Sequence, residues 1–395
     1  MLENILATCI DCQNSASPLL KGEGLITGDG TMNSIPIRIA ILGAGGILGA
    51  HAAGIRAAGE ACTVVAVARA NPVKVEDVHR FFGPEVEVVG DNLAVIVRDD
   101  IDAIINLLPH DLHMETTIAA ARAGKHVLVE KVMARNVWEC DRMIEACEAA
   151  GVNLTVAHDR RYQPHWMALK RVVDSGILGE IYQLRLEHNQ DVAVPPTSWI
   201  FSRDQLGGGA VMSCLTHQID ALRWYGGEVA GVTAMSKVIP DRMEGETMGV
   251  IAARMASGAL AHVAINWATR GGWSKQHCLP GEFTHITGSK GEAYYVCGQQ
   301  PEAFVMLYAE PELASPFTEE TPAANTFARI TPLGSWTGHE RCVTEWLKLL
   351  RGEPAEVTTP GRDSRQTVEV AEAAYRAEAR GCVVQLPITP EPWEQ

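Results

Sequence analysis

The first two-fifths of the chain alternate short apolar runs with amphipathic stretches. Between Ile37 and Ala157 the apolar runs read IRIAIL, VVAVA, AIINLL, HVLVE and NLTVA, and the first is followed by a helical pattern through His51 to Ala58. Because these runs are nearly all apolar instead of alternating, they predict parallel strands that are covered on both faces. We therefore expect a doubly wound α/β domain over residues 35–157.

The pattern changes after Gly176. Longer alternating segments such as Tyr182–His188 and Ala259–Trp267 predict a large, mostly antiparallel open sheet with one polar face. We expect residues 158–395 to form this second, α+β domain for the substrate, with the open face making a homodimer or homotetramer. The helical segments Glu340–Leu350 and Asp363–Ala379 and the terminal strand CVVQLP should pack back onto the two domains.

Composition narrows the class of partner. The net charge of −15 over 395 residues argues against nucleic acid and anionic membranes, because phosphate groups require clustered Lys and Arg. No apolar stretch approaches the ~18 residues that span a bilayer, and the start lacks a secretory signal. Residues 1–34 are rich in Gly, Ser, Thr and Asn and predict a disordered extension or a misassigned start. A small-molecule substrate is the expected partner.

Cysteine and histidine spacing gives little sign of a metal. Only Cys9 and Cys12 stand at close paired spacing among ten cysteines, and the thirteen histidines include no HExxH. Scattered cysteines of this kind read as reduced thiols, which favours a cytoplasmic protein. We expect no bound metal.

A glycine-rich segment follows the first predicted strand. It reads Gly43-Ala44-Gly45-Gly46-Ile47-Leu48-Gly49 and opens the first helix. In a dinucleotide-binding fingerprint the first glycine permits a tight turn, and the second lets the backbone approach the pyrophosphate at the helix N-terminus. Gly43 and Gly45 fit these roles. Leu48 takes the third position, so helix–strand packing must be achieved differently here.

The residue after the second strand bears on the choice of cofactor. The fingerprint expects an Asp or Glu for the ribose of NAD, but this chain has Arg69, with Lys74 as a second cation nearby. A guanidinium there would pair with the 2′-phosphate of NADP. The sequence therefore predicts NADP over NAD in a Rossmann domain, and the alternative is that Arg69 is a solvated surface charge.

The segment Asp102–Met133 carries a more specific pattern, DAIINLLPHDLHMETTIAAARAGKHVLVEKVM. It resembles the Gfo/Idh/MocA family of sugar and polyol dehydrogenases, and the resemblance covers roughly residues 35–390. The matching positions in this segment are Pro109, His113, Gly124, Lys125, His126, Glu130 and Lys131. Further matches are Arg161, Pro164, Gly176, Gly179, the glycines at 207–209, His217 and Asp220.

The resemblance implies a function and a catalytic pair. It implies an oxidoreductase in which Lys131 contacts the nicotinamide and the substrate hydroxyl and His217 acts as acid or base, with Pro109, His113 and Glu130 at the cofactor. Oxidising a secondary alcohol requires proton removal as hydride leaves, and histidine titrates near neutral pH. Without the resemblance, Lys131 reads as a loop cation and His217 as a structural helix histidine.

Two positions depart from the family pattern. Val132 replaces a proline that often follows a cis peptide bond, so we expect the Lys131 loop to take a different path. Ser213 replaces an Asp one helical turn before His217; serine can orient the imidazole but cannot stabilise imidazolium by charge. Asp159 or Asp220 could substitute for that Asp.

Substrate contacts are expected outside the carboxyl ends of the strands. The candidates are His158, Asp159, Arg161, Tyr162, Trp199, Ser213 and His217. Their mixture of charged and polar groups suits a polyhydroxylated substrate, although Arg161 would also accept an acid. Two other functions stay open: transient oxidation by a tightly held nicotinamide that enables elimination or hydrolysis of a glycoside, and a non-catalytic NADP-binding sensor.

Overall fold

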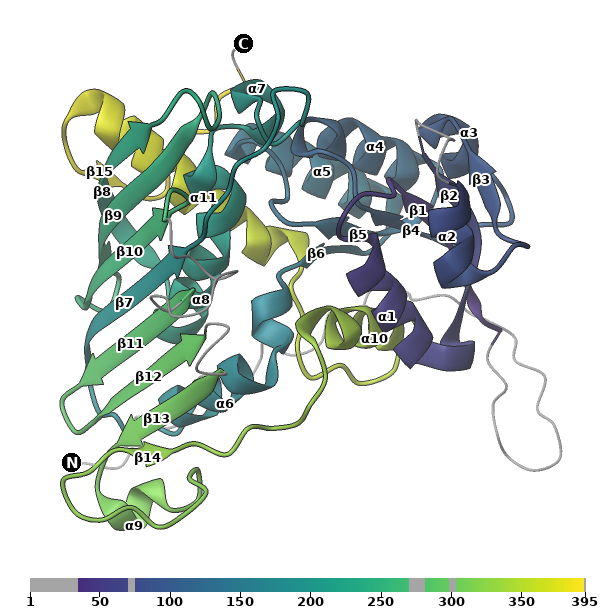
Figure 1. Cartoon of the computed structure of the whole chain (residues 1–395). Coiled ribbons are helices and arrows are strands. Elements are labelled where there is room, and N and C mark those ends of the chain that lie inside the picture. The colour runs from purple at the N-terminus through teal and green to yellow at the C-terminus, as the bar shows by residue number, and fades with distance from the viewer. Residues whose placement is uncertain (1–34, 70–74, 270–280, 298–302, 394–395) are drawn as a thin grey trace, which may run out of the picture.

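The computed structural model describes residues 35–69, 75–269, 281–297 and 303–393. Two sheets stand side by side with helices between and around them, as Figure 1 shows. One sheet is formed by residues before Asp159 and the other by residues after Leu178.

The first sheet is parallel throughout, with strand order β3-β2-β1-β4-β5-β6. Its strands are β1 (Ile37–Leu42), β2 (Cys62–Ala68), β3 (Glu87–Val89), β4 (Ala103–Asn106), β5 (His126–Glu130) and β6 (Leu154–Ala157). Its helices are α1 (Leu48–Ala58), α2 (Val75–Phe82), α3 (Asn92–Ile96), α4 (His110–Arg122) and α5 (Val137–Ala150). The prediction of a doubly wound sheet is confirmed. The apolar pattern missed β3, a three-residue edge strand that begins with an exposed glutamate.

The second sheet has nine strands in the order β14-β13-β12-β11-β7-β10-β9-β8-β15. All its pairs are antiparallel except β7 with β10, so the predicted mostly antiparallel sheet is confirmed. The strands are β7 (Ile181–Asn189), β8 (Val229–Val238), β9 (Glu246–Met255), β10 (Leu260–Asn266), β11 (Glu282–Gly288), β12 (Glu292–Cys297), β13 (Phe304–Tyr308), β14 (Ala328–Arg329) and β15 (Val384–Gln385).

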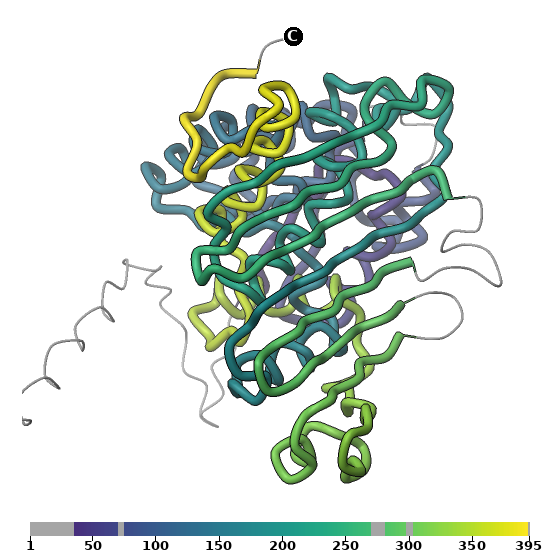
Figure 2. The backbone as a smooth tube through the Cα atoms, turned by 90° about the vertical axis from the view of Figure 1, so that its left-hand side faces the viewer, coloured from purple at the N-terminus to yellow at the C-terminus, as the bar shows by residue number. Residues whose placement is uncertain are grey.

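Helices cover one face of this sheet and leave the other open. The helices are α6 (Pro164–Asp174), α7 (Arg203–Leu206), α8 (Thr216–Gly226) and α9 (Pro311–Ala314), of which α6 and α8 lie on the covered face. Figure 2 looks onto the opposite face, where the strands run uncovered. Met235 and Val250 pair across β8 and β9 with exposed side chains, and Leu260 on β10 is also exposed.

Two late helices tie the sheets together. Helix α10 (Gly338–Leu350) packs on α1, where a Cβ on Gly54 would lie 2.8 Å from the Val343 side chain, so glycine lets the helices approach closely. Helix α11 (Gly361–Arg380) packs against both α5 and β8. Both predicted helices therefore return to the body of the protein, as the sequence indicated. None of the helices within the described ranges combines the length and the apolar character needed to cross a bilayer.

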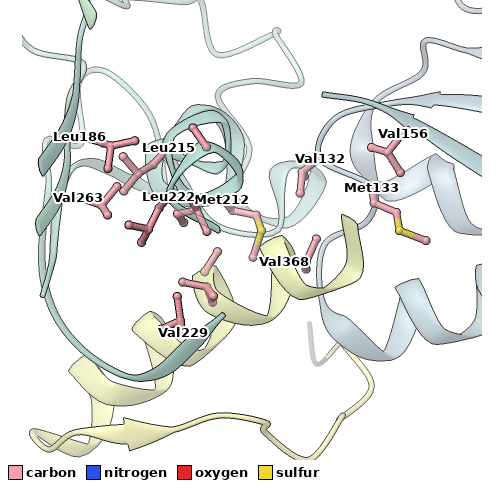
Figure 3. Close-up of a cluster of buried hydrophobic side chains, with 14 of the residues drawn as sticks. Val132, Met133, Val156, Leu186, Met212, Leu215, Leu222, Val229, Val263 and Val368 are labelled. Carbon is pink, nitrogen blue, oxygen red and sulfur yellow. The ribbon is translucent and has the colours of Figure 1, made fainter. Parts of the chain in front are cut away.

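The two sheets share one hydrophobic core. Val132 and Met133, just after β5, belong to the same buried cluster as Leu215 and Val263 of the second domain. Figure 3 shows Val368 of α11 between these two groups. Burial of apolar surface stabilises a fold by ~25 cal/mol per Å², so this continuous core keeps the ends of β5 and β6 in place against α8. The candidate site is built at this junction.

Candidate active site

The glycine loop between β1 and α1 has the form that a pyrophosphate requires. Gly43 has φ +89°, and a Cβ there would lie 2.8 Å from the Leu107 carbonyl oxygen, so only glycine makes this turn without strain. A Cβ at Gly45 or Gly46 would meet no atom within 4 Å, which leaves the backbone open to a ligand. Residue Ile47, which precedes α1, provides no side-chain cap, so the positive end of the helix is left without a side-chain acceptor, although the Leu48 and Ala50 amides donate to backbone carbonyl groups.

The residues of this loop therefore fit a dinucleotide. Leu48, at the third fingerprint position, is buried in the core between α1 and the sheet. One residue later, a Cβ on Gly49 would lie 3.3 Å from the Phe81 ring, so this glycine lies close to the helix α2 and not to a strand. How α1 packs on the strand without a glycine at position 48 is answered by Leu48, which is buried there.

Arg69 stands directly after β2, at the edge where the cofactor's adenosine end would lie. Its amide donates to the Val89 carbonyl oxygen at 2.8 Å, and the residue is half-buried. Lys74, the second predicted cation, lies outside the described residues.

The loop that carries Lys131 is braced by His113 from α4. His113 Nδ1 lies 3.0 Å from the Val132 carbonyl oxygen, and Nε2 lies 2.8 Å from that of Leu108. The Lys131–Val132 peptide bond is cis. The expectation that valine diverts this loop is therefore wrong: the bond is cis although no proline follows Lys131. His113 is fully buried and contacts these carbonyls, so its role is to position the loop.

Lys131 and His217 are brought near each other where the end of β5 meets α8. Lys131 Nζ donates to the Ser213 carbonyl oxygen at 3.2 Å, one helical turn before His217. Burial lowers the pKa of His217 well below its ordinary value, and the nearby charges of Arg160 and Lys131 lower it further. The imidazole is therefore neutral at pH 7, the form that accepts a proton.

Asp159, just past β6, is the carboxylate that lies near His217. Its Oδ1 lies 3.4 Å from His217 Nδ1, and its Oδ2 accepts from Arg160 at 2.6 Å. Of the two acids considered as substitutes, Asp159 therefore contacts the histidine. Asp220 is instead held by Arg161 through two hydrogen bonds of 2.6 and 2.8 Å.

A second buried group lies behind Lys131. Glu130 Oε1 lies 2.7 Å from His51 Nε2 and 3.4 Å from His339 Nε2, and Oε2 accepts from the Lys131 amide at 3.0 Å. These three side chains have the ligand types of a metal site, with ligand atoms within 4.8 Å of one another. Although burial works against ionisation, the two histidines hold the pKa of Glu130 well below its usual range. The arrangement is that of a carboxylate shared by two imidazoles, and it fixes the amide of Lys131.

Several predicted substrate contacts are placed in packing roles. Tyr162 is 1% exposed and its hydroxyl lies 3.0 Å from Thr359 Oγ1, so its assignment to the substrate stays a prediction. Arg161 is used in ion pairs with Asp220 and Asp363, and His158 is 1% exposed.

The remaining predicted residues flank the junction. Trp199 is half-buried and meets the His110 ring edge-on at 4.9 Å between centroids. Pro109 directly precedes α4 at the carboxyl end of β4. Ser213 is 7% exposed and contributes its carbonyl group to Lys131.

Sequence reasoning missed the groups that come from distant elements. His51 of α1, His339 of α10, and Arg160, His188 and Glu282 join the site only through tertiary contacts. Arg160 alone stood next to a predicted residue, and a buried Arg after a strand end could have been a signal. No spacing along the chain connects His51 with His339.

The glycine loop, the parallel sheet and the Lys131–His217 pair define a dinucleotide-binding α/β protein with a second, mostly antiparallel domain. The chain belongs to the Gfo/Idh/MocA family. Residues 37–158 match the model described as oxidoreductase family, NAD-binding Rossmann fold, and residues 166–294 match the model of the GFO/IDH/MocA C-terminal domain.

Curated relatives match over part of their length. Levoglucosan dehydrogenase of Pseudarthrobacter phenanthrenivorans is 34% identical over 180 residues, 45% of this chain and 46% of the relative. Inositol 2-dehydrogenase of Rhizobium meliloti is 31% identical over 214 residues, 53% of this chain and 61% of the relative. The chain thus spans about half the length of these relatives, and the matches show that it is related to them.

Solved structures agree in fold. Levoglucosan dehydrogenase in complex with NADH and levoglucosan superposes with a TM-score of 0.76 at 22% identity, covering 89% of this chain and 100% of the other. The WlbA dehydrogenase from Bordetella pertussis in complex with NADH and UDP-GlcNAcA gives 0.73 at 24% identity, covering 90% and 100%. At these identities the likeness concerns the fold alone.

Proposed function

We propose that the protein is an NADP-preferring oxidoreductase that transfers hydride between the nicotinamide and a secondary alcohol or ketone of a sugar, polyol or related small molecule. The observation that carries the proposal is the convergence of Lys131, His217 and Asp159 at the carboxyl ends of β5 and β6. The open backbone at Gly45 and Gly46 would hold the pyrophosphate. When bound, the cofactor supplies the hydride acceptor.

The three side chains divide the proton chemistry. His217, neutral at pH 7, removes the hydroxyl proton of the substrate through the ring nitrogen that faces away from Asp159. The Lys131 ammonium stabilises the oxygen as it gains negative charge. Asp159 orients the imidazole and stabilises the imidazolium that forms, as a carboxylate at this distance does in other acid–base pairs.

The substrate class rests on the chemistry of the site and on kinship. An acid–base pair that handles one hydroxyl, together with the half-buried Trp199, suits a polyhydroxylated compound. The relatives named for levoglucosan and inositol act on compounds of this kind by their names, which supports the same class here.

Titration of the purified protein with NADPH and NADH by fluorescence, followed by a sugar and polyol panel read at the nicotinamide absorbance, tests the proposal. We expect tighter binding of NADPH and turnover of at least one polyol. Binding without any net absorbance change during substrate consumption would favour transient oxidation, and binding without consumption would favour a sensor. Failure to bind either cofactor contradicts all three.

The cofactor preference depends on Arg69. Arg69→Asp should lower NADPH affinity at least about 10-fold, because a charge-assisted contact to phosphate is lost and repulsion replaces it. NADH affinity should hold or rise. Arg171→Asp, at an exposed position on α6, is the matched control for the charge change and should leave both affinities unchanged. An unchanged NADPH/NADH ratio in Arg69→Asp would make Arg69 a surface charge.

Assembly and location complete the proposal. The open face of the second sheet carries the exposed Met235, Val250 and Leu260, and an uncovered apolar face of this kind supports a homodimer or homotetramer. The seven cysteines in the described part of the chain are free thiols, which supports a cytoplasmic protein.

A further inference from the structure

A cysteine, a histidine and a glutamate form a line beside the catalytic pair. Cys214 Sγ lies 3.5 Å from His188 Nε2, and His188 Nδ1 lies 3.3 Å from Glu282 Oε1. The three residues come from the turn before α8, from β7 and from β11, so the sequence gives no hint of their meeting. The proposed hydride transfer uses none of them.

Both ring nitrogens of His188 face acceptors. Nδ1 points to the Glu282 carboxylate, and Nε2 lies near the Cys214 sulfur and 3.4 Å from Gln190 Oε1. A neutral imidazole has only one N–H, so the doubly protonated form would let both nitrogens interact favourably with these groups. An imidazolium 3.5 Å from a thiol favours the thiolate.

The surrounding charges agree with this arrangement. Burial by itself would lower the pKa of His188, but Cys214 and Glu282 outweigh burial and raise it to about 10. Burial would likewise raise the pKa of the Cys214 thiol, yet His188, with Lys131 and Arg160 farther off, brings it below its ordinary value. Arg160 in turn holds Glu282 through hydrogen bonds of 2.5 and 2.9 Å.

Cys214 lies close to the proposed catalytic pair and is less enclosed than other cysteines of the core. It is half-buried, in contrast to the fully buried Cys140 and Cys342. It directly follows Ser213, whose carbonyl oxygen binds Lys131 Nζ, and precedes His217 by three residues. A group added to its sulfur would therefore lie near the Lys131–His217 pair.

We propose that Cys214, activated by His188 and Glu282, is a modification site for small soft electrophiles, and for hydrogen peroxide in particular. The thiolate attacks one peroxide oxygen, so an S–O bond forms, the O–O bond breaks and the sulfur loses two electrons. The departing hydroxide takes the proton from His188 Nε2 and leaves as water. A low-molecular-weight thiol then converts the sulfenic acid to a mixed disulfide with release of a second water, and another thiol restores Cys214.

Limited alkylation of the full-length protein with iodoacetamide at pH 6 tests the site. Cys297 is the matched control, since it is also half-buried but burial raises the pKa of its thiol. An ordinary thiol is about 0.3% ionised at pH 6. We expect Cys214 to be labelled at least about 10-fold faster than Cys297, measured by peptide mass spectrometry. Equal or slower labelling of Cys214 overturns the proposal.

A variant and an experiment with an oxidant distinguish activation of the Cys214 thiol from its accessibility. His188→Gln should reduce labelling of Cys214 at pH 6 at least about 10-fold, because the imidazolium is removed. If that variant does not fold, the pH dependence of the Cys214 labelling rate in the wild-type protein replaces it. The rate should stay high at pH values at which glutathione no longer reacts with iodoacetamide. A pH profile like that of glutathione contradicts the proposal. Hydrogen peroxide followed by dimedone should mark Cys214 and not Cys297; no adduct at Cys214 excludes the peroxide reaction.

The effect on turnover rests on the proposed function, whereas the labelling does not. If a polyol is turned over, activity should fall in step with the fraction of Cys214 that is modified. In Cys214→Ser, the peptide that contains position 214 should carry no modification. Loss of activity without labelling, or labelling without loss, contradicts a site beside the catalytic pair. If no turnover is found in the untreated protein, the proposed function fails and the alkylation result still decides the modification site.

Discussion

At the scale of single residues, the site depends on charges that burial makes strong. His217 is 7% exposed and lies near Lys131, Arg160 and Asp159; burial comes first in lowering its pKa, and the charges of Arg160 and Lys131 lower it further. A neutral imidazole held beside an ammonium is a base that is ready before the substrate arrives. Each of these residues makes its own testable contribution.

Replacing the base should remove turnover while sparing the cofactor. We expect His217→Ala to lower kcat by about 10² or more, because general bases contribute on that scale, with NADPH affinity nearly unchanged. Steady-state kinetics and fluorescence titration measure the two quantities. His285→Ala is the control, because it removes a histidine of β11 that pairs with Glu292. Normal turnover in His217→Ala would take that residue out of the mechanism.

Asp159 should be visible in the pH profile. Its negative charge favours the imidazolium form of His217, so Asp159→Asn should lower the pKa of His217 still further. Since the neutral form is active in alcohol oxidation, the acid limb of kcat/KM should move to lower pH while kcat falls on the order of 10-fold or more. Asp141→Asn, which also breaks a carboxylate–arginine pair, should change neither. An unmoved acid limb would reduce Asp159 to a structural role.

At the scale of elements, the turn between β1 and α1 separates folding from binding. In Gly43→Ala the new Cβ would lie 2.8 Å from the Leu107 carbonyl oxygen at φ +89°, and a conformation of this kind costs roughly 1–3 kcal/mol. In Gly45→Ala the methyl group meets only open space. We therefore expect a lower Tm only in Gly43→Ala, and weaker NADPH binding with an unchanged Tm in Gly45→Ala. Full NADPH binding by Gly45→Ala would contradict the pyrophosphate site.

Sequence patterns predicted the long elements better than the short ones. The strand runs of the first domain and the helices α10 and α11 emerged from apolar periodicity, because each buries a face over several turns or residues. β3 was missed since three residues carry no period. The geometry at Lys131–Val132 also escaped prediction, because the carbonyl groups that His113 contacts come into place only in the folded loop.

At the scale of the whole molecule, the uncovered sheet face makes a prediction about assembly. If copies associate there, Met235→Lys combined with Val250→Lys places two charges at the centre of the interface and should yield monomers, as measured by light scattering after size exclusion. Leu93→Lys with Val97→Lys, at exposed apolar positions on and beside α3, controls for added charge. An unchanged assembly in the first variant would place the interface elsewhere.

The sequence by itself determined the two kinds of sheet and the glycine turn, and its resemblance to the Gfo/Idh/MocA family pointed to Lys131 and His217 as the proposed catalytic pair. The periods of strands and helices and the φ of a tight turn are local properties, so the order of residues along the chain predicts them. Only the tertiary structure decided that Asp159 contacts His217, that Glu130 lies between His51 and His339, and that Cys214 meets His188. These contacts join residues far apart in sequence through a shared core, and burial of charge acquires its strength only once that core has closed.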